Sequence, residues 1–269
     1  MHVYLRGGLV FDEHEFLERR VRWLADMSEF IKPGVIAELG CGSGFVLDFL
    51  TARYPDSRLI GVDILMSRLE QVLSKRQRNI SVVNADMNHS LFADGSVDTI
   101  LIVSTLHIIS CNGGDYAIQN LLATVHRALK PGGVLILQDY LKPEGASVVL
   151  EFPDDNTRAR FDRFAKEFNP RHVSCSDTGT SVVLDIADAA DFLSSCHSSS
   201  EEKWQEAMQE SHMIFTKDYL RNLVTAVGLS VVDEKIHFDR EIKLFPECGL
   251  IKDTVSYDSK WISFAAMKS

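Results

Sequence analysis

Apolar positions along the chain first follow a helical period and then fall into short continuous runs. From Glu13 to Ile31 they recur every three or four residues, which predicts an amphipathic helix ended by the Lys-Pro-Gly sequence at 32–34. After that, apolar runs alternate with helical stretches. Strands are expected at 35–39, 57–64, 80–87, 97–109 and 134–140, and helices at 45–54, 65–78 and 116–130. Because the runs lack polar alternation, they predict a parallel sheet covered by helices on both faces.

The alternation stops after Tyr140 and resumes near residue 213. Within this gap, helices are expected in 153–170, in 186–195 and from about 198 onward. A helix at 216–228 and strands at 229–238 and 260–268 complete the pattern. The chain is therefore predicted to be one α/β domain with a doubly wound, mostly parallel seven-stranded sheet and a helical insertion after the fifth strand. Its expected parts are an N-terminal helical segment (1–34), a core (35–142), the insertion (143–212) and a C-terminal helix with two strands (213–269).

Composition and charge narrow the classes of function. Of the 269 residues, 45% are hydrophobic and 25% are charged, as in an ordinary globular protein, and the net charge is -10. An acidic chain argues against nonspecific binding to nucleic acid. The first residues lack the apolar segment of a secretory signal, and the longest apolar run is too short to span a bilayer, so we expect a cytoplasmic protein without a membrane partner. The scattered cysteines form no CxxC pair, which predicts reduced thiols and no metal site.

The strongest local signal is the stretch Val-Ile-Ala-Glu-Leu-Gly-Cys-Gly-Ser-Gly at 35–44. A glycine loop between a strand and a helix lets a ligand approach the backbone closely, with the helix N-terminus behind it. The dinucleotide fingerprint G-x-G-x-x-G would need glycine at position 45, where Phe45 stands. Here the glycines are spaced by two, and Glu38 precedes the first of them by two residues.

This arrangement resembles the first motif of the class I S-adenosylmethionine (SAM) dependent methyltransferases, E/D-x-G-x-G-x-G. The resemblance continues with an acid that ends the second expected strand, Asp63, and with Asp86 and Met87 after the third. The sequences "DGSVDTILIVSTLHII" and "ALKPGGVLILQDY" resemble the family's later segments. The resemblance covers roughly residues 35–140 and implies a Rossmann-like fold, SAM as cofactor and S-adenosylhomocysteine as product.

The resemblance also implies roles for individual residues. Glu38 helps to hold the methionine end of SAM or the glycine loop, Asp63 binds the ribose hydroxyls, and Asp86 accepts from the adenine amino group beside Met87. Taken alone, Asp63 could equally be a helix cap. Cys41 is expected to be a small loop residue and not a nucleophile, although thiols near helix N-termini can have a lowered pKa. The full expected cofactor set is Glu38, Gly40, Cys41, Gly42, Gly44, Asp63, Ile64, Asp86, Met87 and Ser104.

Candidates for catalysis follow the fourth and fifth expected strands. His107 lies at the sheet edge where open α/β sheets bind ligands, and histidine suits proton removal near neutral pH. A packed or capping histidine is an equal alternative. Asp139 and Tyr140 end the fifth strand at the same edge and are expected to face the methyl acceptor. Glu210 and His212 could line the pocket, but we assign them no catalytic role. The basic run at 75–78 is expected to be a solvated helix end, and Asp98 to cap structure.

The acceptor is expected to be a small molecule with an oxygen or nitrogen nucleophile, methylated by in-line displacement. Nucleic-acid amino-methylating enzymes of this fold often carry D/N-P-P-Y/F after the fourth strand, where this chain reads "STLH". The insertion is interpreted as a lid, with an oligomer interface as the alternative, and the protein as a monomer or homodimer. Two other functions stay open: a SAM-dependent rearrangement or cyclisation without methyl transfer, and a noncatalytic SAM-binding module.

Overall fold

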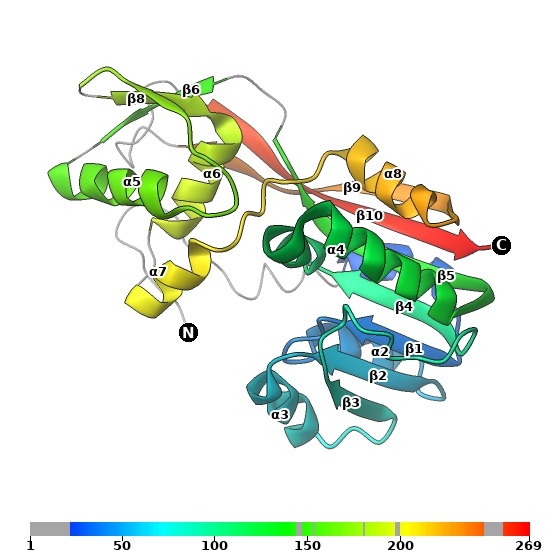
Figure 1. Ribbon diagram of the computed structural model, residues 1–269. Coiled ribbons are helices and arrows are strands. Elements are labelled where there is room, and N and C mark those ends of the chain that lie inside the picture. Colours follow the sequence, from blue (N-terminus) through cyan, green and yellow to red (C-terminus); the bar gives the residue numbers. More distant parts are fainter. Residues whose placement is uncertain (1–21, 144–146, 153, 180, 197–199, 245–254) are drawn as a thin grey trace. The chain divides into compact units, whose positions relative to one another are not determined.

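The structure, a computed structural model, describes residues 22–143, 147–152, 154–179, 181–196, 200–244 and 255–269 (Figure 1). These residues fall into two compact units. One contains the described residues of 18–139, 216–237 and 262–269, and the other those of 140–215 and 238–261. Each unit is described by itself. None of the described helices combines the length and apolar character that a bilayer span requires.

Most of the predicted sheet lies in the first unit. The strands of the sheet are β1 (Val35–Leu39), β2 (Arg58–Asp63), β3 (Ile80–Asn84), β4 (Val97–Val103), β5 (Leu129–Leu141), β9 (Leu229–Leu244) and β10 (Val255–Lys268). The described residues of β5, β9 and β10 that fall within 140–141, 238–244 and 255–261 belong to the second unit. The strands lie in the order β3-β2-β1-β4-β5-β10-β9. β1 is parallel to both β2 and β4, and further parallel pairs join β2 to β3 and β4 to β5. The strand order therefore changes direction between β1 and β4, the switch point where such sheets bind ligands.

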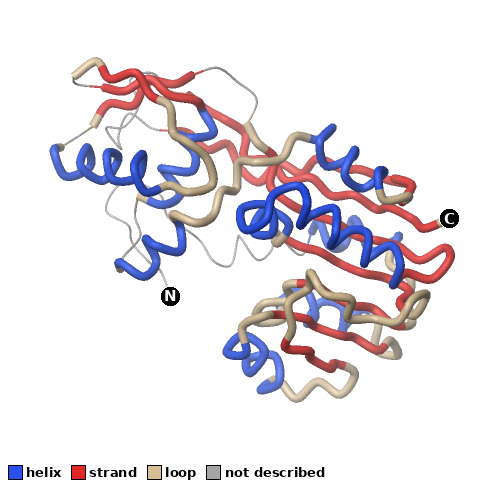
Figure 2. Tube along the Cα trace, in the orientation of Figure 1, coloured by secondary structure: helices blue, strands red, loops and turns tan. Residues whose placement is uncertain are grey.

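Helices flank this sheet (Figure 2). Residues 22–27 are helical and lead into a short 3-10 helix, η1 (Ser28–Phe30); the rest of the predicted N-terminal helix lies outside the described residues. The others are α2 (Phe45–Arg53), α3 (Met66–Ser74), α4 (Leu106–Ala128) and α8 (Lys217–Ala226). The central strands are buried, with Ile36, Leu101 and Ile136 fully inaccessible. The predicted α/β class, with its mostly parallel seven-stranded sheet, is confirmed.

Three predicted boundaries around the fourth and fifth strands were wrong. The fourth strand was expected to reach residue 109, but β4 ends at Val103, and α4 begins at Leu106. Ser104 has a positive φ of 49°, which breaks the extended backbone, so His107 lies in the first turn of a helix. The helix expected from residue 116 consequently begins ten residues earlier, with a kink at Gly114 (φ 60°, ψ -159°). β5 begins at Leu129 and not at Val134.

The second unit contains the predicted insertion and more strands than expected. Its helices are α5 (Asp155–Glu167), α6 (Ile186–Ser195) and α7 (Glu201–Ala207), each close to a predicted helix. The side chains of Asp154, Asp185 and Ser200 cap them by accepting from backbone N–H groups. The sequence analysis did not predict the antiparallel sheet β6-β8-β7, formed by β6 (Ser147–Glu151), β7 (Cys175–Asp177) and β8 (Ser181–Asp185). These strands are only three to five residues long, too short for a clear pattern.

The insertion has its own aromatic core. Phe161 and Phe164 of α5 contact Phe192 of α6, with ring centroids 5.2 and 5.4 Å apart. Trp204 of α7 is buried in the same cluster. The apolar face of α5 is thus covered inside the unit, and it provides no argument that the insertion must close over something else. The predicted boundaries 143–212 and the lid role stay predictions.

Candidate functional site

The glycine loop after β1 has the backbone that its glycines allow. Gly40, Gly42 and Gly44 have φ values of +78°, +53° and +83°. The N–H groups of Gly40 and Cys41 both donate to the carbonyl of Val62 in β2, at 2.8 and 2.9 Å. A Cβ atom on Gly40 would lie 2.5 Å from Thr105 Oγ1, whereas one on Gly42 would meet no atom within 4 Å. The first glycine is therefore required by packing, and the second leaves open space beside the loop.

Asp63, at the end of β2, fastens this loop to the next one. Its Oδ2 accepts the N–H of Gly42 at 2.9 Å, and its Oδ1 accepts the N–H of Leu65 at 2.8 Å. The residue is only 4% exposed. Asp63 does not cap α3, whose N-cap residue is Leu65 and which has no side-chain cap; its carboxylate instead ties two loops together. Each carboxylate oxygen can accept more than one hydrogen bond, so the ribose role stays a prediction.

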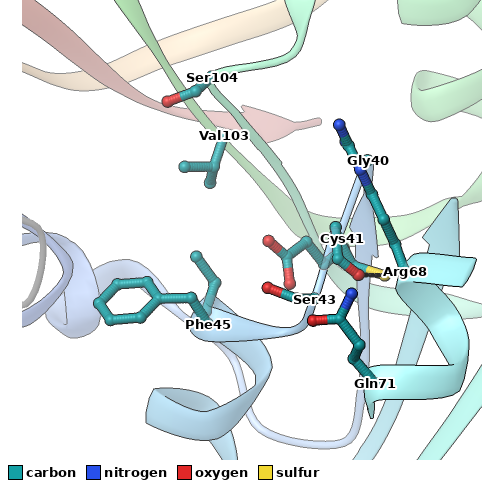
Figure 3. Close-up of a pocket in the computed structure, with 11 residues that line it drawn as sticks. Gly40, Cys41, Ser43, Phe45, Arg68, Gln71, Val103 and Ser104 are labelled. Atoms are coloured by element: carbon teal, nitrogen blue, oxygen red, sulfur yellow. Dashed lines mark hydrogen bonds between the residues drawn. The ribbon is translucent and has the colours of Figure 1, made fainter. Parts of the chain in front are cut away.

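A pocket of about 330 Å³ lies against the glycine loop, at the carboxyl ends of β1 and β4. In Figure 3, Arg68 and Gln71 from α3 and Phe45 from α2 surround Cys41 and Ser43. The lining residues are Glu38, Gly40, Cys41, Gly42, Ser43, Phe45, Val46, Arg68, Gln71, Val103 and Ser104. The structure therefore brings five of the predicted cofactor residues to one pocket: Glu38, Gly40, Cys41, Gly42 and Ser104.

Cys41 is a poor nucleophile in this setting. Its side chain is buried, and burial is the largest cause of a strongly raised pKa of the thiol, followed by the nearby carboxylates of Glu38 and Asp63. Arg68 opposes these effects, but it does not cancel them. A raised pKa keeps the thiol protonated near neutral pH, so Cys41 acts as a small packing residue in the loop.

The remaining predicted cofactor residues lie around this loop and after β3. Gly44 is the N-cap residue of α2. Ile64, directly after β2, is 63% exposed. Asp86 accepts from both the backbone and the side-chain amide of Asn88 through Oδ1, at 2.9 and 3.0 Å. Met87 is buried. None of these four is among the residues that line the pocket.

Three polar residues of α3 and its C-terminal end were missed as site residues. Arg68 and Gln71 line the pocket, and Lys75 binds the back of the loop. Lys75 Nζ donates to the Ser43 carbonyl at 2.8 Å and to Asp48 of α2 at 2.6 Å. Lys75 lies at the exposed C-terminal end of α3, as predicted, and it also binds the loop, which was not predicted. The spacing 68, 71, 75 is one helical stripe, so the sequence did hold a signal that could have identified them together.

Ser104 closes the β4 end of the pocket in a strained conformation. Its φ of 49° is unfavourable for a residue with a side chain. Its N–H donates to the carbonyl of Gln138 at 2.9 Å, and its Oγ to Gln138 Oε1 at 3.2 Å. β5 thereby holds the turn after β4, so Gln138 is a further positioning residue that the sequence analysis missed.

His107 and Asp139 form a buried pair at the ends of α4 and β5. His107 Nδ1 lies 2.8 Å from Asp139 Oδ1, and the backbone N–H of His107 donates to Asp139 Oδ2 at 3.1 Å. Both residues are almost fully buried. The carboxylate fixes the proton on Nδ1, which leaves Nε2 as the nitrogen that can accept a proton. Two of the three residues predicted to be catalytic are therefore in direct contact, and their catalytic roles stay predictions.

Tyr140, the third residue predicted to be catalytic, follows Asp139 in the chain and belongs to the second unit. Its ring packs edge-on against His212 at a centroid distance of 4.8 Å and against Trp261 at 4.5 Å. The backbone N–H of His212 donates to Asp191, a buried carboxylate that also receives bonds from Arg171 and Ser211. Tyr140 is thus part of an aromatic cluster held by a buried ionic network.

Comparison with known proteins agrees with these motifs. A sequence profile described as a methyltransferase domain matches residues 36–133. Over 174 residues the chain is 29% identical to the malonyl-[acyl-carrier protein] O-methyltransferase of Methylovorus sp. (strain MP688), which covers 59% of this chain and 55% of that protein. Over 130 residues it is 33% identical to the trans-aconitate 2-methyltransferase of Acidovorax sp. (strain JS42), covering 47% and 45%. The chain spans about half the length of these curated relatives.

Among solved structures, it resembles the 1,6-didemethyltoxoflavin-N1-methyltransferase of Burkholderia thailandensis, which holds 1,6-didemethyltoxoflavin and S-adenosylhomocysteine. The TM-score is 0.53 at 16% identity, and the match covers 96% of this chain and 80% of that one. At this identity the likeness speaks for the fold alone. The profile match, the motif series and the sheet order confirm the predicted family. Residues 36–133 thus match a methyltransferase domain, in agreement with the resemblance to the class I SAM-dependent methyltransferases.

Proposed function

We propose that the protein methylates an oxygen or nitrogen atom of a small molecule, with SAM as the methyl donor. The observation that carries this proposal is the pocket at the glycine loop, at the switch point between β1 and β4. The names of the two sequence relatives add that related chains act on malonyl-[acyl-carrier protein] and on trans-aconitate. Both compounds carry carboxylic acid groups, so small acids are the first acceptors to test.

The acceptor groups and the apolar surface around the loop fit SAM. Glu38 offers a carboxylate to an ammonium group, and the open space beside Gly42 lets a ligand approach the backbone. Asp63 and Asp86 offer carboxylate oxygens to hydroxyl and amino groups, and the exposed Ile64 offers an apolar surface to adenine. When bound, SAM supplies a methyl group on a positively charged sulfur, which is already activated for in-line displacement.

The contribution of the protein to the reaction is alignment, exclusion of water and, for some acceptors, removal of a proton. A hydroxyl or amine acceptor must lose its proton as its new bond to carbon forms. We propose that His107 Nε2 takes this proton and that Asp139 stabilises the resulting imidazolium. A carboxylate acceptor has already lost its proton at neutral pH and would need no such base. The effect of replacing His107 therefore distinguishes the two acceptor types.

Binding and turnover test the proposal separately. We expect calorimetry to show binding of SAM and S-adenosylhomocysteine and none of NAD. We expect incubation of the protein with methyl-labelled SAM and a panel of small acids, phenols and amines to transfer label to at least one acceptor. Bulk tRNA serves as the comparison acceptor, and Gly40→Ala as the matched protein control.

Each failure points to a different alternative. Tight NAD binding without a response to SAM would contradict the family assignment. SAM binding with substrate isomerisation but no label transfer would identify a rearrangement or cyclisation. SAM binding without any turnover would favour a noncatalytic binding module, and label on tRNA alone would contradict the small-molecule proposal.

The lid role of residues 143–212 is a separate proposal. It is supported by the length of the segment, about 70 residues, where an ordinary connection takes ~4–6. We expect backbone amides of this segment to exchange more slowly when S-adenosylhomocysteine and acceptor are bound. Equal exchange in both states, with slower exchange at higher protein concentration, would identify an oligomer interface.

A further inference from the structure

Two opposite charges face the glycine-loop pocket. Among the described residues that line it, only Glu38 and Arg68 carry formal charges. Glu38 lies on β1 and is 2% exposed, so its carboxylate is nearly removed from water. Arg68 lies on α3 and is exposed, and in Figure 3 its side chain extends along the pocket toward Gly40 and Cys41. The pocket therefore offers a negative and a positive group to the same ligand.

Arg68 is not used by the fold. Within the described part of the chain, its guanidinium makes no hydrogen bond and no ion pair, whereas Lys75, two turns further on, binds Asp48 and the Ser43 carbonyl. The positive charge of Arg68 acts on the loop nonetheless. Burial, Glu38 and Asp63 raise the pKa of the Cys41 thiol, and Arg68 is the side chain that acts against them. The guanidinium is therefore near the loop and available to a ligand.

The amino-acid end of SAM matches this pair of charges, because it carries one ammonium and one carboxylate group. Guanidinium and carboxylate groups form two parallel, charge-assisted hydrogen bonds. We propose that Arg68 binds the carboxylate of SAM while Glu38 binds its ammonium group. This inference rests on the proposed SAM binding and names Arg68 as the residue that recognises the amino-acid end.

Ligands that lack one group at a time test the proposal. Decarboxylated SAM keeps the ammonium and loses the carboxylate, and 5'-methylthioadenosine lacks both. We expect Arg68→Met to weaken binding of SAM and S-adenosylhomocysteine by about 10- to 150-fold, the range for losing a hydrogen-bonded charged group. The same variant should bind decarboxylated SAM and 5'-methylthioadenosine as wild type does. Arg78→Met, a change at an exposed arginine outside the pocket lining, should leave all four affinities unchanged.

Glu38→Gln tests the other charge of the pair. It should weaken the binding of both SAM and decarboxylated SAM, but not the binding of 5'-methylthioadenosine. Unchanged binding of 5'-methylthioadenosine also shows that the adenosine site is intact in either variant. If Arg68→Met binds SAM as wild type does, or loses decarboxylated SAM to the same degree, the inference is overturned while the proposed function stands. If wild type binds neither SAM nor 5'-methylthioadenosine, the proposed function fails, and the inference with it.

Discussion

Asp139 holds His107 through both of its carboxylate oxygens, one on the imidazole and one on the backbone. Oδ1 lies 2.8 Å from Nδ1, and Oδ2 accepts the backbone N–H at 3.1 Å. The strand β5 thus fixes at once the first turn of α4, the orientation of the ring and its tautomer. This arrangement is the one expected if Asp139 orients His107 as a base, the role proposed for the pair.

Replacing His107 tests whether it removes a proton. With a hydroxyl or amine acceptor, His107→Gln should lower kcat by about 10²- to 10⁴-fold, the usual contribution of a positioned base. The affinity for SAM should stay within about twofold of wild type, because His107 does not line the glycine-loop pocket. Steady-state kinetics and calorimetry measure the two effects. Turnover close to that of wild type would contradict the proton-acceptor role and indicate an acceptor that reacts as an anion.

The partner variant Asp139→Asn separates orientation from proton transfer. Its amide nitrogen can donate to Nδ1, which would move the ring proton to Nε2 and block acceptance there. We expect a loss of kcat similar to that of His107→Gln, and a double variant that is no worse than either single one, since the residues act as a unit. Additive losses in the double variant would show that the two residues contribute independently.

Asp63→Ala should weaken SAM binding by roughly 1.5–3 kcal/mol, the scale of lost hydrogen bonds to a charged group. The structure adds a second effect, because Asp63 also accepts the N–H groups of Gly42 and Leu65. We therefore expect reduced stability as well, measured by urea unfolding. Asp63→Asn keeps one oxygen acceptor. Relative to wild type, its free energy of unfolding should fall less than its free energy of SAM binding. An unchanged dissociation constant for Asp63→Ala would place the ribose site elsewhere.

The glycine loop should respond to alanine in a graded way. Gly40→Ala combines a positive φ with a Cβ atom 2.5 Å from Thr105, so it should cost about 2 kcal/mol or more and abolish SAM binding. Gly95→Ala also has a positive φ of +63°, but it meets open space and should cost only about 1 kcal/mol. Thermal unfolding and calorimetry of both variants provide the comparison. Equal losses would show that backbone strain dominates and packing contributes little.

Lys75 is expected to position the loop without contacting the ligand. Lys75→Met removes the bonds to the Ser43 carbonyl and to Asp48, both made by partly exposed groups. Because such pairs are weak, SAM affinity should fall only about two- to fivefold, and the fold should be retained. Arg78→Met is the matched control. A drop far beyond this range would indicate direct contact between Lys75 and the ligand.

Asp98 is expected to make stability depend on pH at the acid end. Burial acts to raise the pKa of its carboxyl, but hydrogen bonds from Lys130 and the Val35 N–H outweigh it, and the pKa is lowered. A lowered pKa in the folded state means that the stabilisation is complete above the unfolded pKa of about 4 and is lost as pH falls through the folded value. Asp98→Asn should therefore cost roughly 1 kcal/mol near pH 7, discounted for the partial exposure of Lys130, and less below about pH 4. The prediction is contradicted if the difference in unfolding free energy between wild type and Asp98→Asn is the same near pH 7 as below about pH 4.

Short-range patterns in the sequence were enough to predict most of the residues expected to bind the cofactor. The spacing of Glu38, Gly40, Gly42 and Gly44 fixes a strand, a loop and a helix start within ten residues. Asp63 was identified through the resemblance, as the acid that ends the second expected strand. Capping side chains such as Asp154 were equally readable, since they act on backbone groups within three residues.

The tertiary structure alone decided the groups that act over long separations. His107 and Asp139 are 32 residues apart, and the left-handed turn at Ser104, held by Gln138, is what moves His107 from a strand into a helix. Whether Arg68 faces the pocket and Lys75 the loop depends on the rotation of α3 against β1 and α2, for which helical spacing gives only the shared stripe. These contacts depend on packing between segments that are distant in the sequence. The residues next to a given position therefore do not predict them.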